Sequence, residues 1–95
     1  KKISDPDLVL KATVYWRHLY LYGSEFPAKH VFTVKLRARN DNVWVKLGVL
    51  RSDKNGKIED DFRIPKEYDD TKYFEICLKD TKTGCKVCKY ITRTW

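Results

Sequence analysis

Three cysteines near the C-terminal end of the sequence, Cys77, Cys85 and Cys88, are the residues best suited to chemistry. A Cys-x-x-Cys pair such as Cys85 and Cys88 can bind zinc or exchange disulfides, provided that both sulfurs lie on one side of the backbone. The surrounding sequence predicts a strand, in which residues three apart lie roughly 10 Å from each other on opposite faces. No second Cys pair has zinc-finger spacing, and no helical pattern follows as in redox motifs. The spacing therefore argues against a metal or redox site.

A disulfide is the more consistent use of these cysteines. If residues 81–84 form a four-residue loop, Asp80 faces Cys85 and Cys77 faces Cys88 across a hairpin. We therefore predict a Cys77–Cys88 disulfide, while a shifted register would pair Cys77 with Cys85 instead. Three reduced, structural cysteines are the remaining alternative.

Basic residues gather in the same region. The formal net charge is +7 with an isoelectric point near 9.4, which predicts attraction to polyanions unless the charge serves only solubility. The predicted ligand-binding residues of this region are Lys82, Lys86, Lys89, Tyr90 and Arg93. Anionic lipid or glycan is favoured over nucleic acid as the partner, because Tyr90 alone is placed for stacking on bases.

The alternation of a strand separates these basic side chains. Lys86 shares a face with Tyr90, whereas Lys89 and Arg93 share the opposite face with Val87. They can converge on one partner if the last strand is an edge, around which long side chains reach from both faces.

Catalytic signatures are missing from the sequence. It contains no Gly-x-Ser-x-Gly nucleophile motif, no glycine-rich phosphate loop and no His-x-x-x-His pair. Asp53-x-Asn55 resembles the start of a calcium loop, but Lys57 and Ile58 occupy the positions that need an oxygen ligand and a glycine. We predict no enzyme activity and no cofactor. No apolar run approaches the length of a membrane span.

The elements that carry these residues follow a period of two, which is typical of strands. Asn40-Asp41-Asn42 and Asn55-Gly56 are turn signals that predict hairpins on both sides of the third segment. Residues 66–72 are predicted as one helical turn or a polar loop. The predicted strands cover residues 8–22, 32–38, 43–49, 58–64, 74–78 and 87–95.

The apolar parity of these strands predicts one core. We expect an all-β fold over residues 1–95, a sandwich of about six to eight short, mostly antiparallel strands of immunoglobulin-like or transthyretin-like type. In the third segment Val43, Val45, Leu47 and Val49 are predicted to point inward. The residues predicted to be buried are Trp16, Phe32, Val34, Leu36, Val45, Leu47, Phe74, Ile76 and Val87.

With the strands placed, the chain resembles the secreted nematode transthyretin-like family. The matching features, in order, are Gly23 before Pro27-Ala28, Val34-x-Leu36, Ser52-Asp53-x-x-Gly56-x-Ile58, and Phe74-x-Ile76 followed by cysteines. The Tyr-Arg-Gly-Ser tail of the related urate-pathway hydrolases is absent, since the sequence ends Thr92-Arg93-Thr94-Trp95. The resemblance implies a binding protein without hydrolase activity.

The expected role is a secreted, non-enzymatic binding module that recognises or carries an anionic or small ligand. The lack of any Met and the three cysteines favour either a secreted protein after signal removal or a domain from a longer chain. The competing interpretation is a structural or adhesive immunoglobulin-like domain of a prokaryotic surface protein or filament. The oligomeric state stays open, with a homo-oligomer among the alternatives.

Overall fold

The chain folds as seven strands and one short helical turn. The computed structural model describes residues 2, 3 and 5–95. The elements are β1 (Val9–Tyr15), β2 (His18–Ser24), β3 (Val31–Ala38), β4 (Val45–Arg51), β5 (Ile58–Arg63), the 3-10 turn η1 (Lys66–Tyr68), β6 (Tyr73–Asp80) and β7 (Lys86–Thr94). Among these described residues, no helix is long and apolar enough to cross a membrane.

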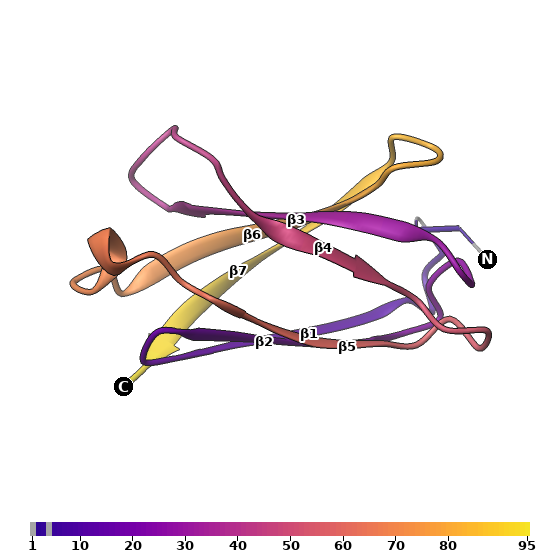
Figure 1. The fold of residues 1–95 in the computed structure, drawn as a ribbon, viewed down its shortest axis with the longest axis horizontal. Helices are drawn as coiled ribbons and strands as arrows, with labels where there is room; N and C mark the ends of the chain where they lie inside the picture. The colour runs from indigo at the N-terminus through magenta and orange to yellow at the C-terminus, as the bar shows by residue number, and fades with distance from the viewer. Residues whose placement is uncertain (1, 4) are drawn as a thin grey trace.

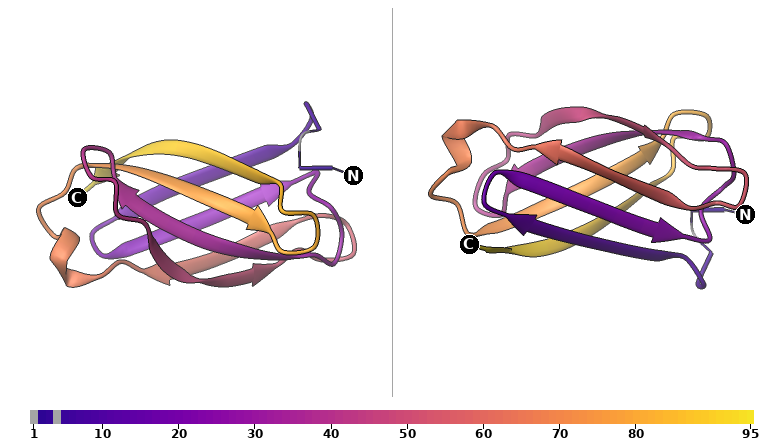
Figure 2. Two further views of the ribbon diagram at one scale, coloured as in Figure 1. Left: turned by 90° about the horizontal axis from the view of Figure 1, so that it is seen from above. Right: turned by 60° about the horizontal axis from the view of Figure 1, so that its bottom comes forward.

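The strands form two layers that face each other across the core (Figure 1). One layer has the order β4-β3-β6-β7 and the other β1-β2-β5. All pairs are antiparallel except β7 with β1, which pair over Val14–Arg93 and Tyr15–Thr94. Figure 2 shows the two layers from further directions. The all-β sandwich predicted from the sequence is confirmed, and the short β1–β7 pairing joins its two layers.

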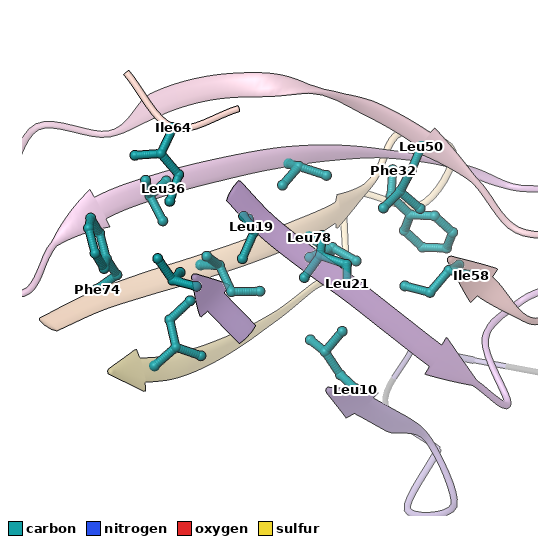
Figure 3. Packing of buried hydrophobic residues seen from close by; sticks show 14 of the residues in the cluster. Leu10, Leu19, Leu21, Phe32, Leu36, Leu50, Ile58, Ile64, Phe74 and Leu78 are labelled. Atoms are coloured by element: carbon teal, nitrogen blue, oxygen red, sulfur yellow. The ribbon is translucent and has the colours of Figure 1, made fainter. Parts of the chain in front are cut away.

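Side chains from both layers meet in the core (Figure 3). Phe32, Val34 and Leu36 on β3 are fully buried, as are Phe74 and Ile76 on β6, and these five predictions are confirmed. Val45, Leu47 and Val87 are only partly buried, packed against the edge of the core. The prediction that Trp16 is buried is wrong, because 55% of its surface is exposed.

Trp16 lies in a hairpin loop and not in a strand. The predicted strand 8–22 is in fact two strands, since Tyr15 pairs with His18 and leaves Trp16 and Arg17 as a two-residue loop. The turn inverts the parity, so Leu19 points inward while the tyrosines of β2 point outward. Trp16 has a φ of 55°, a backbone conformation that residues with a Cβ atom adopt at a cost in free energy.

Replacing Trp16 by Gly is therefore expected to stabilise the domain, although the sequence pattern placed this residue in the core. Glycine adopts positive φ freely, and relief of this strain is worth about 1 kcal/mol. Trp16→Ala is the matched control, because it removes the ring and keeps the strain. Urea denaturation should show the Gly variant to be the more stable of the two. A Gly variant less stable than the Ala variant would contradict this account of the loop.

The inward row predicted for β4 is broken by a bulge. The pairing with β3 shifts between Val34, which faces Gly48, and Lys35, which faces Lys46. The extra residue reverses the parity, so Leu50 is buried while Val49 is 52% exposed. Val43, also predicted to be inward, lies in the loop before β4 and is exposed.

The Asn55-Gly56 turn forms, but it does not make a hairpin. The Asp53 carboxylate accepts the N–H groups of Asn55 at 2.8 Å and Lys57 at 2.9 Å, and Gly56 has a φ of 77°. The strand that follows pairs with β2 of the other layer and not with β4. A Cβ at Gly56 would overlap the carbonyl oxygen of Phe26, so the turn packs closely against the connection between β2 and β3. The predicted hairpin is wrong, and the turn is a crossover.

Of the two alternatives for residues 66–72, the helical turn is confirmed as η1. Its Tyr68 is buried, with its ring edge-on to that of Phe74 at 6.1 Å between centroids. Arg17 of the β1–β2 loop forms an ion pair of 2.6 Å with Asp69, which holds the pKa of this carboxyl below its usual value. The turn therefore closes one end of the sandwich.

Candidate anion-binding face

The predicted disulfide is present on the outer side of the β6–β7 hairpin. Cys77 and Cys88 are direct partners in the register, with their Cα atoms 4.1 Å apart, and their sulfurs are bonded. Both lie on the parity opposite to the buried Ile76. Cys85 is free and exposed. The Cys77–Cys88 prediction is confirmed, and the disulfide fixes the two strands that carry the cluster of basic residues.

Asp80 sets the register of this hairpin from within. Its buried carboxylate accepts hydrogen bonds from the Lys82 N–H at 2.9 Å and lies 2.7 Å from Nδ1 of His30. Burial opposes ionisation of Asp80, but these hydrogen bonds outweigh it and lower the pKa of the carboxyl. The Asp80 backbone also bonds to Cys85 and Gly84, which closes the four-residue loop. Lys82 is thereby held at an exposed hairpin tip.

The five residues predicted to bind a ligand do not share one surface. Lys86 and Tyr90 are exposed on the outer side of β7, and Lys82 lies at the hairpin tip. Lys89 and Arg93 are on the inner parity, as the alternation predicted. The Lys89 ammonium donates a hydrogen bond of 2.7 Å to the Leu10 carbonyl and so bridges β7 to β1.

Arg93 serves the fold. It is 97% buried, since its exposed fraction is 3%, and its guanidinium donates to the carbonyls of Tyr68 and Asp69 at the end of η1. The guanidinium also lies 5.3 Å from the centre of the Phe74 ring. These contacts leave Arg93 facing away from the surface that carries Lys86, so the structure does not bring these two residues together.

Three other lysines join Lys86 on the outer side of its layer. Lys79 of β6 is the direct partner of Lys86, and Lys35 of β3 is the direct partner of Lys46 on β4. Lys35 also pairs with Cys77, so the two lysine pairs occupy neighbouring rows beside the disulfide. A pocket of about 320 Å³ opens here, lined by Thr33, Lys35, Trp44, Cys77, Lys79, Gly84 and Lys86.

This arrangement of charge costs stability. Like charges placed directly opposite each other destabilise a sheet, and here two such pairs adjoin. Within the described residues, no carboxylate lies within ion-pair distance of these four lysines. Glu75, the acid on the same side, is held by Arg37 at 2.6 Å. An anion in the pocket would relieve the repulsion, which is the expected design of an anion-binding site.

The same side continues into a cluster of arginine and aromatic side chains. The Arg37 guanidinium lies 5.2 Å from the centre of the Trp44 ring. Arg39 lies 4.6 Å from the ring of Tyr90 and 5.8 Å from that of Tyr73. Such contacts orient the cations while leaving the rings accessible, since all three aromatics are exposed. We define the basic face as the outer side of β4-β3-β6-β7 with Lys35, Arg37, Arg39, Trp44, Lys46, Tyr73, Lys79, Lys86 and Tyr90.

One group of potential metal ligands is found in the described part of the chain. The side-chain ligand atoms of Glu75, Cys77 and Cys88 lie within 4.8 Å of one another. Both sulfurs belong to the disulfide, so they are not available as thiolates. The group therefore has no donor set for a metal ion while the disulfide is intact.

Comparisons with models of protein families, with curated proteins and with solved structures give no match.

Proposed function

We propose that this chain is a non-enzymatic, extracellular binding module whose basic face holds a polyanion, with a sulfated glycan as the favoured ligand. The observation that carries the proposal is the lysine pocket beside the disulfide, with Lys35, Lys79 and Lys86 on its walls. Sulfate groups would give these lysines the anionic partners that the described structure does not, and the exposed Trp44 ring would pack against a sugar. An extracellular location is supported by the disulfide and by the resemblance to transthyretin-like proteins.

Three matched sets of measurements test the proposal: binding to heparin, to phosphatidylserine vesicles and to single-stranded DNA, each across a salt series. Electrostatic binding must weaken as salt rises. The variant Lys35→Glu/Lys79→Glu/Lys86→Glu should bind heparin roughly 100-fold more weakly, at about 1 kcal/mol for each lysine beside an anionic surface. The control Lys29→Glu/Lys54→Glu/Lys66→Glu makes the same charge change at exposed positions outside the strands and should have a much smaller effect.

Equal losses in the two triple variants would contradict a site and assign the charge to solubility. Tighter binding to vesicles than to heparin would show that the ligand is an anionic membrane surface and not a glycan.

Single-stranded nucleic acid is a second candidate, favoured by one observation. Trp44, Tyr73 and Tyr90 lie among the arginines of the basic face, where successive bases could stack. The sequence had indicated Tyr90 alone. Replacing Trp44 and Tyr73 by Ala should weaken DNA binding strongly and heparin binding slightly if the face is a nucleic-acid platform. A larger loss of heparin binding than of DNA binding would favour the glycan.

A further inference from the structure

The opposite side of the sandwich carries a surface of contrasting chemistry. On the outer side of β1-β2-β5, Tyr20 pairs with Asp61 and Tyr22 pairs with Glu59 in the register. Both tyrosines are exposed, at 45% and 43% of their surface. They line a groove of about 580 Å³ together with Lys11, Thr13, Leu21, Glu59, Asp60 and Asp61. We call this surface the tyrosine–acid face.

Each tyrosine–carboxylate pair has the chemistry of a cation-binding unit. An aromatic ring attracts a Lys or Arg through its negative face, and a neighbouring carboxylate adds a charged hydrogen bond. In the described part of the chain, no cation lies within ion-pair distance of Glu59, Asp60 or Asp61. β5 is also the last strand of its layer, so these carboxylates stand at an open edge. Lys11 lies on the same face as the partner of Tyr22, so one lysine accompanies three carboxylates and the face keeps a negative net charge that can receive further cations.

The spacing of these units matches the basic face. Two residues apart on one strand, Tyr20 and Tyr22 lie roughly 6.7 Å from each other. Lys35 and Arg37 on β3, and Arg39 directly after it, repeat at the same two-residue interval. The two faces are the outer sides of the two layers, so they point in opposite directions (Figure 1). A copy cannot satisfy its own tyrosine–acid face with its own basic face, but the next copy can.

The size of the faces is sufficient for specific association. Two of the extents of the molecule are 37 and 21 Å, and the layers present faces of these dimensions (Figure 1). Such a face offers at most about 800 Å² on each partner, which is the size of a standard protein–protein interface. Exposed tyrosines on both faces, with Trp44 and the arginines of the basic face, are of the residue types enriched in such interfaces.

From this complementarity we infer that the protein associates head to tail, the tyrosine–acid face of one copy docking on the basic face of a second copy. Because the two contact surfaces differ, each added copy leaves one face of each kind free, and association continues into an open chain or a ring. The inference shares the basic face with the proposed function but does not depend on polyanion binding.

Sedimentation velocity over a range of protein concentrations at low and high salt tests this inference. The wild-type protein should form species larger than dimers as concentration rises, and high salt should dissociate them. Glu59→Gln/Asp61→Asn and Lys35→Gln/Lys79→Gln each remove one face, and each variant alone should associate roughly tenfold more weakly. Mixed together, the two variants should form a 1:1 heterodimer that does not grow, because each still offers the one intact face that the other lacks.

Glu67→Gln/Asp70→Asn and Lys54→Gln/Lys66→Gln make the same charge changes at exposed positions outside the strands and should associate like the wild type. A monomeric wild type at every concentration would overturn the inference, and so would a wild type that stops at a dimer. Heparin binding separates the two proposals. Glu59→Gln/Asp61→Asn should weaken self-association and keep heparin affinity, whereas Lys35→Gln/Lys79→Gln should weaken both.

Discussion

Replacing Leu36 by Ala should lower the free energy of unfolding by about 2–5 kcal/mol, the range for a leucine removed from a packed core. Leu36 has no exposed surface and lies on β3, with β4 on one side and β6 on the other. The side chains around it come from both layers (Figure 3), so the cavity left by the shorter side chain cannot collapse by moving one edge strand. Denaturation in urea, followed by tryptophan fluorescence, measures the loss.

Val49→Thr is the matched control for the parity of the strands. The sequence pattern places Val49 in the core, whereas the bulge between Lys46 and Gly48 turns it outward. The substitution keeps the β-branched shape and adds a hydroxyl, which is costly only where water is excluded. A loss near that of Leu36→Ala would show that Val49 is buried and that the bulge is misplaced. A loss under half a kcal/mol at Leu36 would contradict the core itself.

Removing the disulfide by Cys77→Ala/Cys88→Ala should destabilise the folded chain by about 2–4 kcal/mol. In the described structure, β7 pairs with β1 only at Arg93 and Thr94, so most of the strand is held by β6. The disulfide is the covalent tie at this edge, and it offsets the repulsion between Lys79 and Lys86 two residues away. Thermal and urea denaturation of both proteins without reductant measure the difference.

The free thiol supplies the control for this prediction. Cys85→Ser should leave stability unchanged, because Cys85 is exposed and unbonded. Alkylation of the unfolded wild-type protein should modify one cysteine without reductant and three after reduction. Three modified cysteines in unreduced protein from its native compartment would remove the disulfide, and with it a main support for an extracellular location.

Where the sequence predicted the fold correctly, regular strands lie deep in a layer. Phe32, Val34 and Leu36 alternate with polar or charged residues along β3, and no turn or extra residue in β3 interrupts them. Trp16 was misplaced because its two-residue loop contains none of the Gly or Asn residues that usually reveal one. Asn55-Gly56 shows that the chain turns, but turn chemistry is local and does not specify which strand the next one joins. That choice depends on contacts with β2, far away in the sequence.

The same difference between local and long-range pairing explains which parts of the candidate site could be predicted from the sequence. The disulfide and the partition of Lys86 from Lys89 follow from one hairpin, whose loop length and parity can be read from consecutive residues. Lys35, Lys46 and Lys79 enter the basic face through the pairing of β3 with β4 and β6. The β3–β6 pairing joins segments that are distant in the sequence. The sequence therefore shows that the outward residues of β3 are basic, but not which strands lie beside them. Three-dimensional pairing turned separate charges into a pocket.

The contact of β7 with both layers has a consequence for how this domain is made. A ribosome releases the chain from its N-terminus, so β1 is free long before Arg93 and Thr94, its partners in β7, are synthesised. Until then, the inward residues of β1, β2 and β5 face an incomplete layer, because β3 and β4 are present but β6 and β7 follow later in the chain. The sandwich therefore cannot close before residue 94 has been synthesised. Nascent chains arrested earlier should expose apolar strands to chaperones.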